Sequence, residues 1–190
     1  AAAGSFDTYK LMAGVSGSTE KNSYSIQYQH LRSGGMSSAY DTTGKGDFDL
    51  DGFVQNTING QFSGKFSEKW EWRLNGQAGS YEADLDANAF TDDKDHTANN
   101  SNYLAGGGLT YHIGKAAIKA NYALNSTTRK YIDDSASVGG FAKYSNSTYK
   151  GLSHFAEIFA NFPAGKSWTF LAGADARWQN TTQDYLSISD

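Results

Sequence analysis

The sequence predicts an all-β protein, an antiparallel meander of about eight long strands that forms part of a transmembrane β-barrel. Apolar and polar residues alternate from Thr57 to Phe66 and again from Trp70 to Ala78, so each run has one apolar face and one polar face. Aromatic residues make up 14% of the chain, with 21 glycines and one proline, which favours strands over helices. Short and long polar stretches alternate between the runs, as periplasmic turns and extracellular loops do in outer-membrane barrels.

The same alternation places each element along the chain. Expected strands cover residues 5–17, 22–32, both arms of a hairpin within 51–84, 102–113, 116–129, 149–162 and 168–188. Short breaks are expected at 18–21, 67–69, 114–115 and 163–167, and long loops at 33–52, 84–101 and 130–148. The break at 163–167 holds the single proline, Pro163, where no ladder hydrogen bond is required.

Composition narrows the class of protein further. The chain has no cysteine, which excludes disulfides and thiolate metal sites. Its net charge of −4 gives no reason to expect nucleic acid as a partner. No run of about 18 apolar residues exists, so a transmembrane helix is excluded, whereas a barrel strand needs an apolar residue only at every second position.

The order of turns and loops gives an expectation about the domain. If the short turns are periplasmic, the first strand runs toward the periplasm and the last strand ends outside. Complete outer-membrane barrels normally keep both termini in the periplasm. Residues 1–190 are therefore expected to be a partial transmembrane barrel domain, with at least one further strand before Ser5 and more after Asp190.

Several segments resemble a known family. The stretches SFDTYKLMAGVSG, SYSIQYQHLRSGG and DFDLDGFVQNTINGQFSGKFSEKWEWRLNGQAGSYEADLDA are similar to the barrels of TonB-dependent outer-membrane receptors, and most similar to the cobalamin transporter group. In that group too, an Asp-x-Asp-Gly-Phe segment, here Asp49 to Phe53, opens a strand. The stretch YKGLSHFAEIFANFPAGKSWTFLAGADARW is also similar to receptor barrels, particularly those of Bacteroidetes-like bacteria. The resemblance covers essentially the whole chain, as strands two to nine of about twenty-two.

This resemblance implies a location, partners and a function. The chain would lie in the outer membrane of a Gram-negative bacterium and belong to a transporter for a scarce large nutrient, cobalamin or another corrinoid. Its partners would be the lipid bilayer, its own plug domain, TonB acting through that plug, and the nutrient. The plug, the TonB box and the other strands lie outside these residues, so the chain would supply wall and capture loops and would not transport by itself.

Carboxylates in two expected loops form a candidate calcium site. Asp47, Asp49 and Asp51 alternate, and the next long loop adds Asp84 and Asp86, followed by Asp92, Asp93 and Asp95. Clustered carboxylates repel one another unless a cation neutralises them, and Ca²⁺ takes several oxygen ligands. The resemblance points to Asp49, Asp51, Asp84 and Asp86. An EF-hand does not fit, because position twelve from Asp47 is Ile58. The alternative is that these acidic loops are simply solvated.

Aromatic residues flank the expected short turns. They are Phe66, Trp70, Trp72, Phe162 and Trp168, and they predict an interfacial girdle at the periplasmic edge of the bilayer. The alternative is packing in the core of a soluble protein. Gly106, Gly107 and Gly108 predict either close approach of a plug domain or relief of strand curvature.

No catalytic constellation emerges, and the chain is not expected to be an enzyme. His30, His96, His112 and His154 lie on different segments without zinc-ligand spacing, and no serine is positioned beside a base. Two other functions stay open. A complete eight-stranded outer-membrane barrel, adhesive or structural, predicts pairing of the first and last strands. A soluble β carbohydrate-binding module predicts that Ile58, Phe62, Tyr111 and Ile118 are buried against a second sheet.

Overall fold

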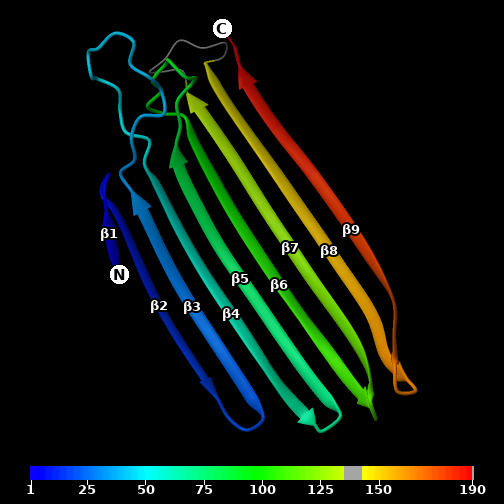
Figure 1. The fold of residues 1–190 in the computed structure, drawn as a ribbon. Coiled ribbons are helices and arrows are strands. Elements are labelled where there is room, and N and C mark those ends of the chain that lie inside the picture. The colour runs from blue at the N-terminus through cyan, green and yellow to red at the C-terminus, as the bar shows by residue number, and fades with distance from the viewer. Residues whose placement is uncertain (135–142, 190) are drawn as a thin grey trace.

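The computed structural model describes residues 1–134 and 143–189, which form one antiparallel sheet whose strands follow each other in chain order (Figure 1). This confirms the predicted all-β meander. The strands of the described residues are β1 (Ala2–Gly4), β2 (Thr8–Ser18), β3 (Asn22–Ser33), β4 (Phe53–Ser67), β5 (Trp70–Asp84), β6 (Thr97–Ile113), β7 (Ala116–Asp134), β8 (Tyr144–Ala164) and β9 (Trp168–Ile188).

The eight predicted strands correspond to β2 to β9, and β1 is an additional short strand. β1 pairs with β2 across a tight turn in which Phe6 and Asp7 have positive φ angles of 59° and 50°. Bringing residues 5–7 into the first strand was therefore wrong. The alternation of apolar and polar residues does not reveal such a reversal, because a turn built from ordinary residues leaves no glycine or proline signal.

Three strands extend further toward the long loops than predicted. β6 begins at Thr97 rather than Asn102, β7 ends at Asp134 rather than Arg129, and β8 begins at Tyr144 rather than Tyr149. The predicted loops 84–101 and 130–148 were correspondingly too long. The added part of β6 and most of the added part of β8 are polar on both faces, and the added part of β7 places Tyr131 and Ile132 side by side on opposite faces. The two-residue hydrophobic signal is therefore lost there while the hydrogen-bonded ladder continues.

The single proline also lies inside a strand. Pro163 pairs with Thr169 near the end of β8, and the turn itself covers residues 165–167. The expected break at 163–167 thus began two residues too early. Pairing between β7 and β8 reaches only Asn161, so Pro163 has a strand on one side alone and its missing N–H weakens no second ladder.

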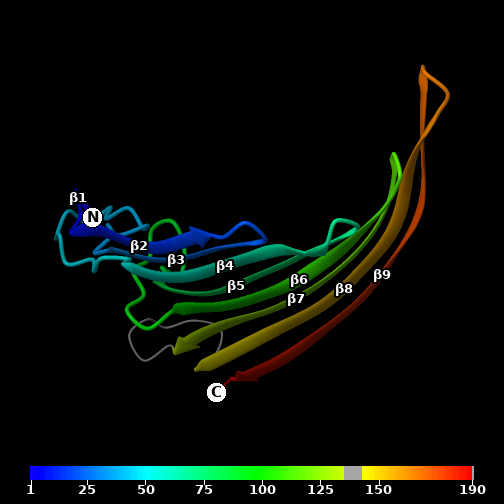
Figure 2. The ribbon, with the colours of Figure 1, turned by 90° about the horizontal axis from the view of Figure 1, so that it is seen from below.

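The turns between β2 and β3, β4 and β5, β6 and β7, and β8 and β9 gather at one end of the sheet, as predicted (Figure 1). The loops at residues 34–52 and 85–96 lie at the other end, together with the tight β1–β2 turn (Figure 1). Gly114 and Gly165 occupy two of the short turns with positive φ angles of 58° and 67°, which glycine adopts without steric cost. Seen from below, the sheet is a single curved layer with no second layer against the described strands (Figure 2). No helix long and apolar enough to cross a membrane occurs in the part of the chain that the structure describes.

The long loops at residues 34–52 and 85–96 lie against each other. The amide of Tyr40 donates to the carbonyl of Ala89 at 2.8 Å, and the amide of Asp84 donates to the carbonyl of Gly52 at 3.0 Å. Gly35 has a φ angle of +70°, and a Cβ there would run into the backbone of Asp51. These contacts bring the acidic segments of the two loops together.

Candidate functional site

The strand register collects the apolar residues of β2 to β9 on one face of the sheet, called the apolar face below. One row of directly paired residues on this face comprises Val15, Ile26, Gly60, Gly76, Ala105, Leu124, His154 and Trp178. A neighbouring row comprises Tyr24, Phe62, Leu74, Gly107, Tyr122, Ala156 and Ala176. The alternation predicted the apolar faces of the runs 57–66 and 70–78, and the pairing makes these faces continuous with those of the neighbouring strands.

The apolar face is open rather than packed. Leu74 is 55% exposed and Ile158 54%, and Ile58, Phe62 and Ile118 are exposed as well. Among the described residues only Ala39 and Ala83 are buried apolar residues. A continuous exposed patch of this kind marks a surface that meets another apolar phase. A soluble module requires burial of Ile58, Phe62, Tyr111 and Ile118, whereas here Tyr111 is half-buried and the other three are exposed.

The register also fixes the tilt of the strands if the short turns share one plane. Asn22, the first residue of β3, connects through successive partners to Ala174 in β9, whereas β9 starts at Trp168. That difference of six residues corresponds to about 20 Å, across six strand spacings that span about 29 Å. The strands therefore incline by about 35° to the normal of the plane that the short turns share. This value is within the range of about 35–45° for the strand tilt of membrane barrels.

The height of the apolar band follows from this tilt. On β9 the band runs from Trp168 to Trp178, and the outward positions beyond it are Asn180, Thr182 and Asp184. Ten steps of about 3.3 Å give about 33 Å along the strand, or about 27 Å along the normal. Membrane barrels carry an outward apolar band about 25 Å tall. The band therefore has the height that a bilayer requires.

The five predicted girdle aromatics all lie at the short-turn end. Phe66 and Trp168 are each 71% exposed, while Trp70 and Phe162 are less exposed and Trp72 is half-buried. The ring of Trp72 stacks on Phe66 with 6.1 Å between centroids. Trp70 and Phe162 each contact a neighbour's ring, Tyr111 at 4.5 Å and Phe170 at 5.8 Å. The structure thus brings these residues to one edge of the band.

A second set of aromatic residues lies at the opposite edge and was missed in the sequence. Tyr9, Tyr103 and Trp178 stand nine or ten positions from the short-turn ends of their strands and are exposed on the apolar face. The Tyr9 hydroxyl hydrogen-bonds His30 Nε2 at 3.1 Å. The alternation of apolar and polar residues could have revealed this second set. Each of these aromatic residues is the last large apolar residue of its strand face before polar residues begin.

The opposite, polar face carries hydrogen-bonding groups. Arg73 Nη2 donates to Asn121 Oδ1 at 3.4 Å, and Asn121 Nδ2 donates to Glu157 Oε1 at 2.8 Å. Gly108 lies between Arg73 and Asn121 in the register, and a Cβ there would run into the Asn121 side chain. Gly108 thus leaves room for the neighbouring Asn121 side chain, which is neither of the two roles predicted for the glycine run.

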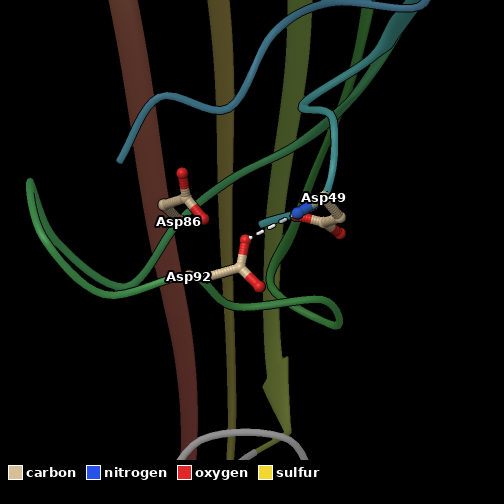
Figure 3. Close-up of side chains that lie close together, drawn as sticks. All are labelled: Asp49, Asp86 and Asp92. Carbon is tan, nitrogen blue, oxygen red and sulfur yellow. Dashed lines mark hydrogen bonds between the residues drawn. The ribbon is translucent and has the colours of Figure 1, made fainter. Parts of the chain in front are cut away.

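Three loop carboxylates converge above the sheet. Oxygens of Asp49, Asp86 and Asp92 lie within 4.8 Å of one another (Figure 3). Asp49 comes from the loop 34–52, and the other two come from the loop 85–96. The Asp49 amide donates to Asp92 Oδ1 at 2.9 Å, which fixes the two loops to each other.

Loop 34–52 wraps around Asp86. The hydroxyls of Ser38 and Ser37 donate to Asp86 Oδ2 at 3.0 and 3.2 Å, and the amide of Ala39 donates to the same oxygen. The amide of Asp93 donates to Asp86 Oδ1 at 3.1 Å. Asp86 is thus the carboxylate that organises both loops.

Asp49, Asp51 and Asp86, in and beside this cluster, have shifted pKa values. Burial, together with hydrogen bonding and repulsion from Asp92, raises the pKa of Asp49 to about 6. Burial also raises the pKa of Asp51, although the hydrogen bond from the Ser38 amide acts to lower it. Burial acts in the same direction on Asp86, but the amide of Ala39 and the Asp51 carboxyl outweigh it and lower the pKa of Asp86.

The donor set fits a hard divalent cation. Asp49 Oδ1 and Asp51 Oδ1 are buried without a hydrogen-bond partner, so each has a lone pair available for an ion. Ca²⁺ prefers several carboxylate and carbonyl oxygens with flexible geometry. Asp47 and Asp84, which the sequence also suggested, lie outside the cluster, at exposed positions. Asp92 takes their place, and only the packing of the two loops reveals it.

A second group of loop and strand carboxylates also lies close together. This group, Asp93, Asp95 and Asp133, lies within the same 4.8 Å limit, and no histidine belongs to either group in the described ranges. Compared with known proteins, the chain matches no family model, and no curated protein matches its sequence.

Proposed function

We propose that this chain forms wall and capture loops of a TonB-dependent outer-membrane transporter in a Gram-negative bacterium. The cargo is a scarce large nutrient, and cobalamin or another corrinoid agrees best with the sequence resemblance. The observation that carries the proposal is the continuous, exposed apolar face of a single tilted sheet, whose band has about the height of a bilayer core. A soluble domain of this size would bury such a face.

In this proposal the two faces of the sheet have different roles. The apolar face meets lipid, with aromatic residues at both edges of the band. The polar face lines a hydrated interior that receives the protein's own plug domain. One register row on that face carries Gln27, Asn59, Gln77, Asn125 and Gln179, and these amides suit contact with water and polar backbone. TonB acts through the plug and not on this chain.

The loops at 34–52 and 85–96 capture the nutrient outside the membrane. Asp49, Asp86 and Asp92 would hold a calcium ion, with Asp51 beside them. When bound, the ion supplies the positive charge that three converging carboxylates require. The protein's own contribution is to hold the loops in register through the hydrogen bonds of Asp86 and the Asp49–Asp92 pair. This ordering gives an incoming ligand a pre-formed surface.

Binding and uptake of cyanocobalamin test the proposal. The full-length protein, purified in detergent, is expected to bind cyanocobalamin, with weaker binding after chelation of calcium. Cells that express it are expected to take up the vitamin only when TonB is present. Binding of neither cyanocobalamin nor other corrinoids would refute the corrinoid assignment, and TonB-independent uptake would refute the transporter class. Unchanged affinity after chelation would remove calcium alone.

A further inference from the structure

We infer that a hollow on the outward face of β4 to β7 binds the phosphorylated sugar headgroup of a lipid in the leaflet nearest the long loops. The hollow has a volume of about 340 Å³. Eight of its ten lining residues come from two register rows on the same face as the apolar band: Asn56, Ser80, Ser101 and Thr128 in one, and Val54, Glu82, Asn99 and Lys130 in the other. Tyr81 and Asn100 complete the lining. This inference rests on the proposed membrane location.

The hollow lies directly beyond the apolar band. The next row toward the short turns contains Ile58, Ala78 and Tyr103, which belong to the band. Ser80 stands ten positions from the start of β5, and Lys130 fourteen from the start of β7. At the tilt derived above these positions lie about 27 and 38 Å from the short-turn edge. Headgroups add about 5–8 Å on each side of a core of about 30 Å, so the hollow is at their depth.

Small side chains create the depression. Ser80 and Ser101 are paired directly across β5 and β6 and form its floor, whereas longer side chains stand around them. The lining offers hydroxyls and amides, which both donate and accept hydrogen bonds, together with one carboxylate and one ammonium group. Hydroxyls and amides suit the hydroxyl groups of a sugar, and Glu82 is a further acceptor for them.

Lys130 supplies the charge that selects a phosphate. It lies at the edge of the hollow, and its row continues through Thr148 to Asp184, so Glu82 and Asp184 are each two strands away, about 10 Å in strand spacing. A basic side chain near an anionic membrane surface contributes roughly fivefold to binding. A lipid with sugar and phosphate together therefore satisfies both parts of the lining, whereas a simple phospholipid satisfies only the ammonium group.

Lipid retention by the full-length protein tests this inference. Purified protein in detergent is mixed with lipid A, a phosphorylated glucosamine disaccharide with acyl chains, and bound lipid is counted by native mass spectrometry. Lys130→Gln is expected to lower retention about fivefold, and Ser101→Trp to abolish it by filling the hollow. Dephosphorylated lipid A and phosphatidylglycerol are both expected to bind more weakly than lipid A.

Matched controls lie on the same outward face. Lys150 and Thr182 share a register row with Ser101 but stand outside the hollow, so Lys150→Gln and Thr182→Trp are expected to keep wild-type retention. Equal loss in Lys150→Gln and Lys130→Gln, full retention in Ser101→Trp, or equal binding of phosphatidylglycerol would each overturn the inference. Quenching of tryptophan by brominated lipids separates the two proposals: strong quenching with unaltered lipid A binding refutes the headgroup site alone, and absent quenching refutes both.

Discussion

Leu74 provides the sharpest test of lipid contact on the apolar face. It lies on β5 midway between Trp70 and Ala78, so it is placed at the centre of the band, and its side chain is 55% exposed. An arginine facing lipid at the bilayer midplane costs about 2–4 kcal/mol. An arginine replacing an exposed leucine on a surface in water changes stability by only about 0.5 kcal/mol. The two accounts therefore differ several-fold for Leu74→Arg.

The assay is urea unfolding of the full-length protein inserted in phosphatidylcholine vesicles, followed by tryptophan fluorescence. Asn75→Arg is the matched control, because Asn75 is the next residue along β5 and points to the polar face. We expect Leu74→Arg to lose about 2–4 kcal/mol of unfolding free energy and Asn75→Arg to stay within about 0.5 kcal/mol. Losses below about 1 kcal/mol at Leu74, or equal losses at both positions, would refute the assignment of the faces.

Two further predictions concern the loops and the packing of β8 with β9. Because the pKa of Asp49 is raised to about 6 from 3.8, the folded loops bind more protons than the unfolded chain between these values, so without cation loop stability falls as pH rises from about 4 to 6. Hydrogen exchange of loop amides should show this loss, with recovery on adding Ca²⁺. The pH effect should be smaller in Asp49→Asn, where Asp51 and Asp86 still titrate with shifted pKa values, and Asp47→Asn should behave as wild type. Gly173→Ala should destabilise by about 1–3 kcal/mol, because its Cβ would lie 2.5 Å from Phe159 Cβ, whereas Gly151→Ala, with nothing within 4 Å, should stay within about 0.5 kcal/mol. Equal effects of the two glycine changes in thermal unfolding would contradict the packing described.

The faces of the strands could be predicted because a two-residue period is a local property of the chain. Alternation around Leu74 and Leu109 alone placed both side chains on one continuous face, and the register agrees. The strand ends at Thr97 and Asp134 could not be predicted, because polar residues occupy both faces near Thr97 and the adjacent Tyr131 and Ile132 break the alternation before Asp134. The tight reversal at Phe6 was missed because its positive φ angles fall on Phe6 and Asp7 rather than on glycine, although Ser5 and Asp7 are common turn residues.

The loop carboxylates show what local sequence cannot specify. Asp49 and Asp86 were candidates from their spacing, and the structure places them together. Asp92 joins them because loop 85–96 doubles back and its carboxylate accepts the Asp49 amide, a contact between residues 43 positions apart. Asp47 and Asp84 had the same spacing signal but lie outside the cluster. Which of several alternating aspartates converge is decided by loop packing, and loop packing depends on contacts distant in sequence.

Spin labels along β5 measure lipid contact of the apolar face most directly. Residues 1–190 contain no cysteine, so single cysteines are placed in turn from Trp72 to Ala78 in the full-length protein, with any cysteine outside these residues replaced by serine, and labelled in bilayers. The account predicts high oxygen accessibility at residues 72, 74, 76 and 78, and high accessibility to a water-soluble nickel complex at 73, 75 and 77. Oxygen accessibility without this two-residue alternation, or water exposure at Leu74 equal to that at Asn75, would contradict it.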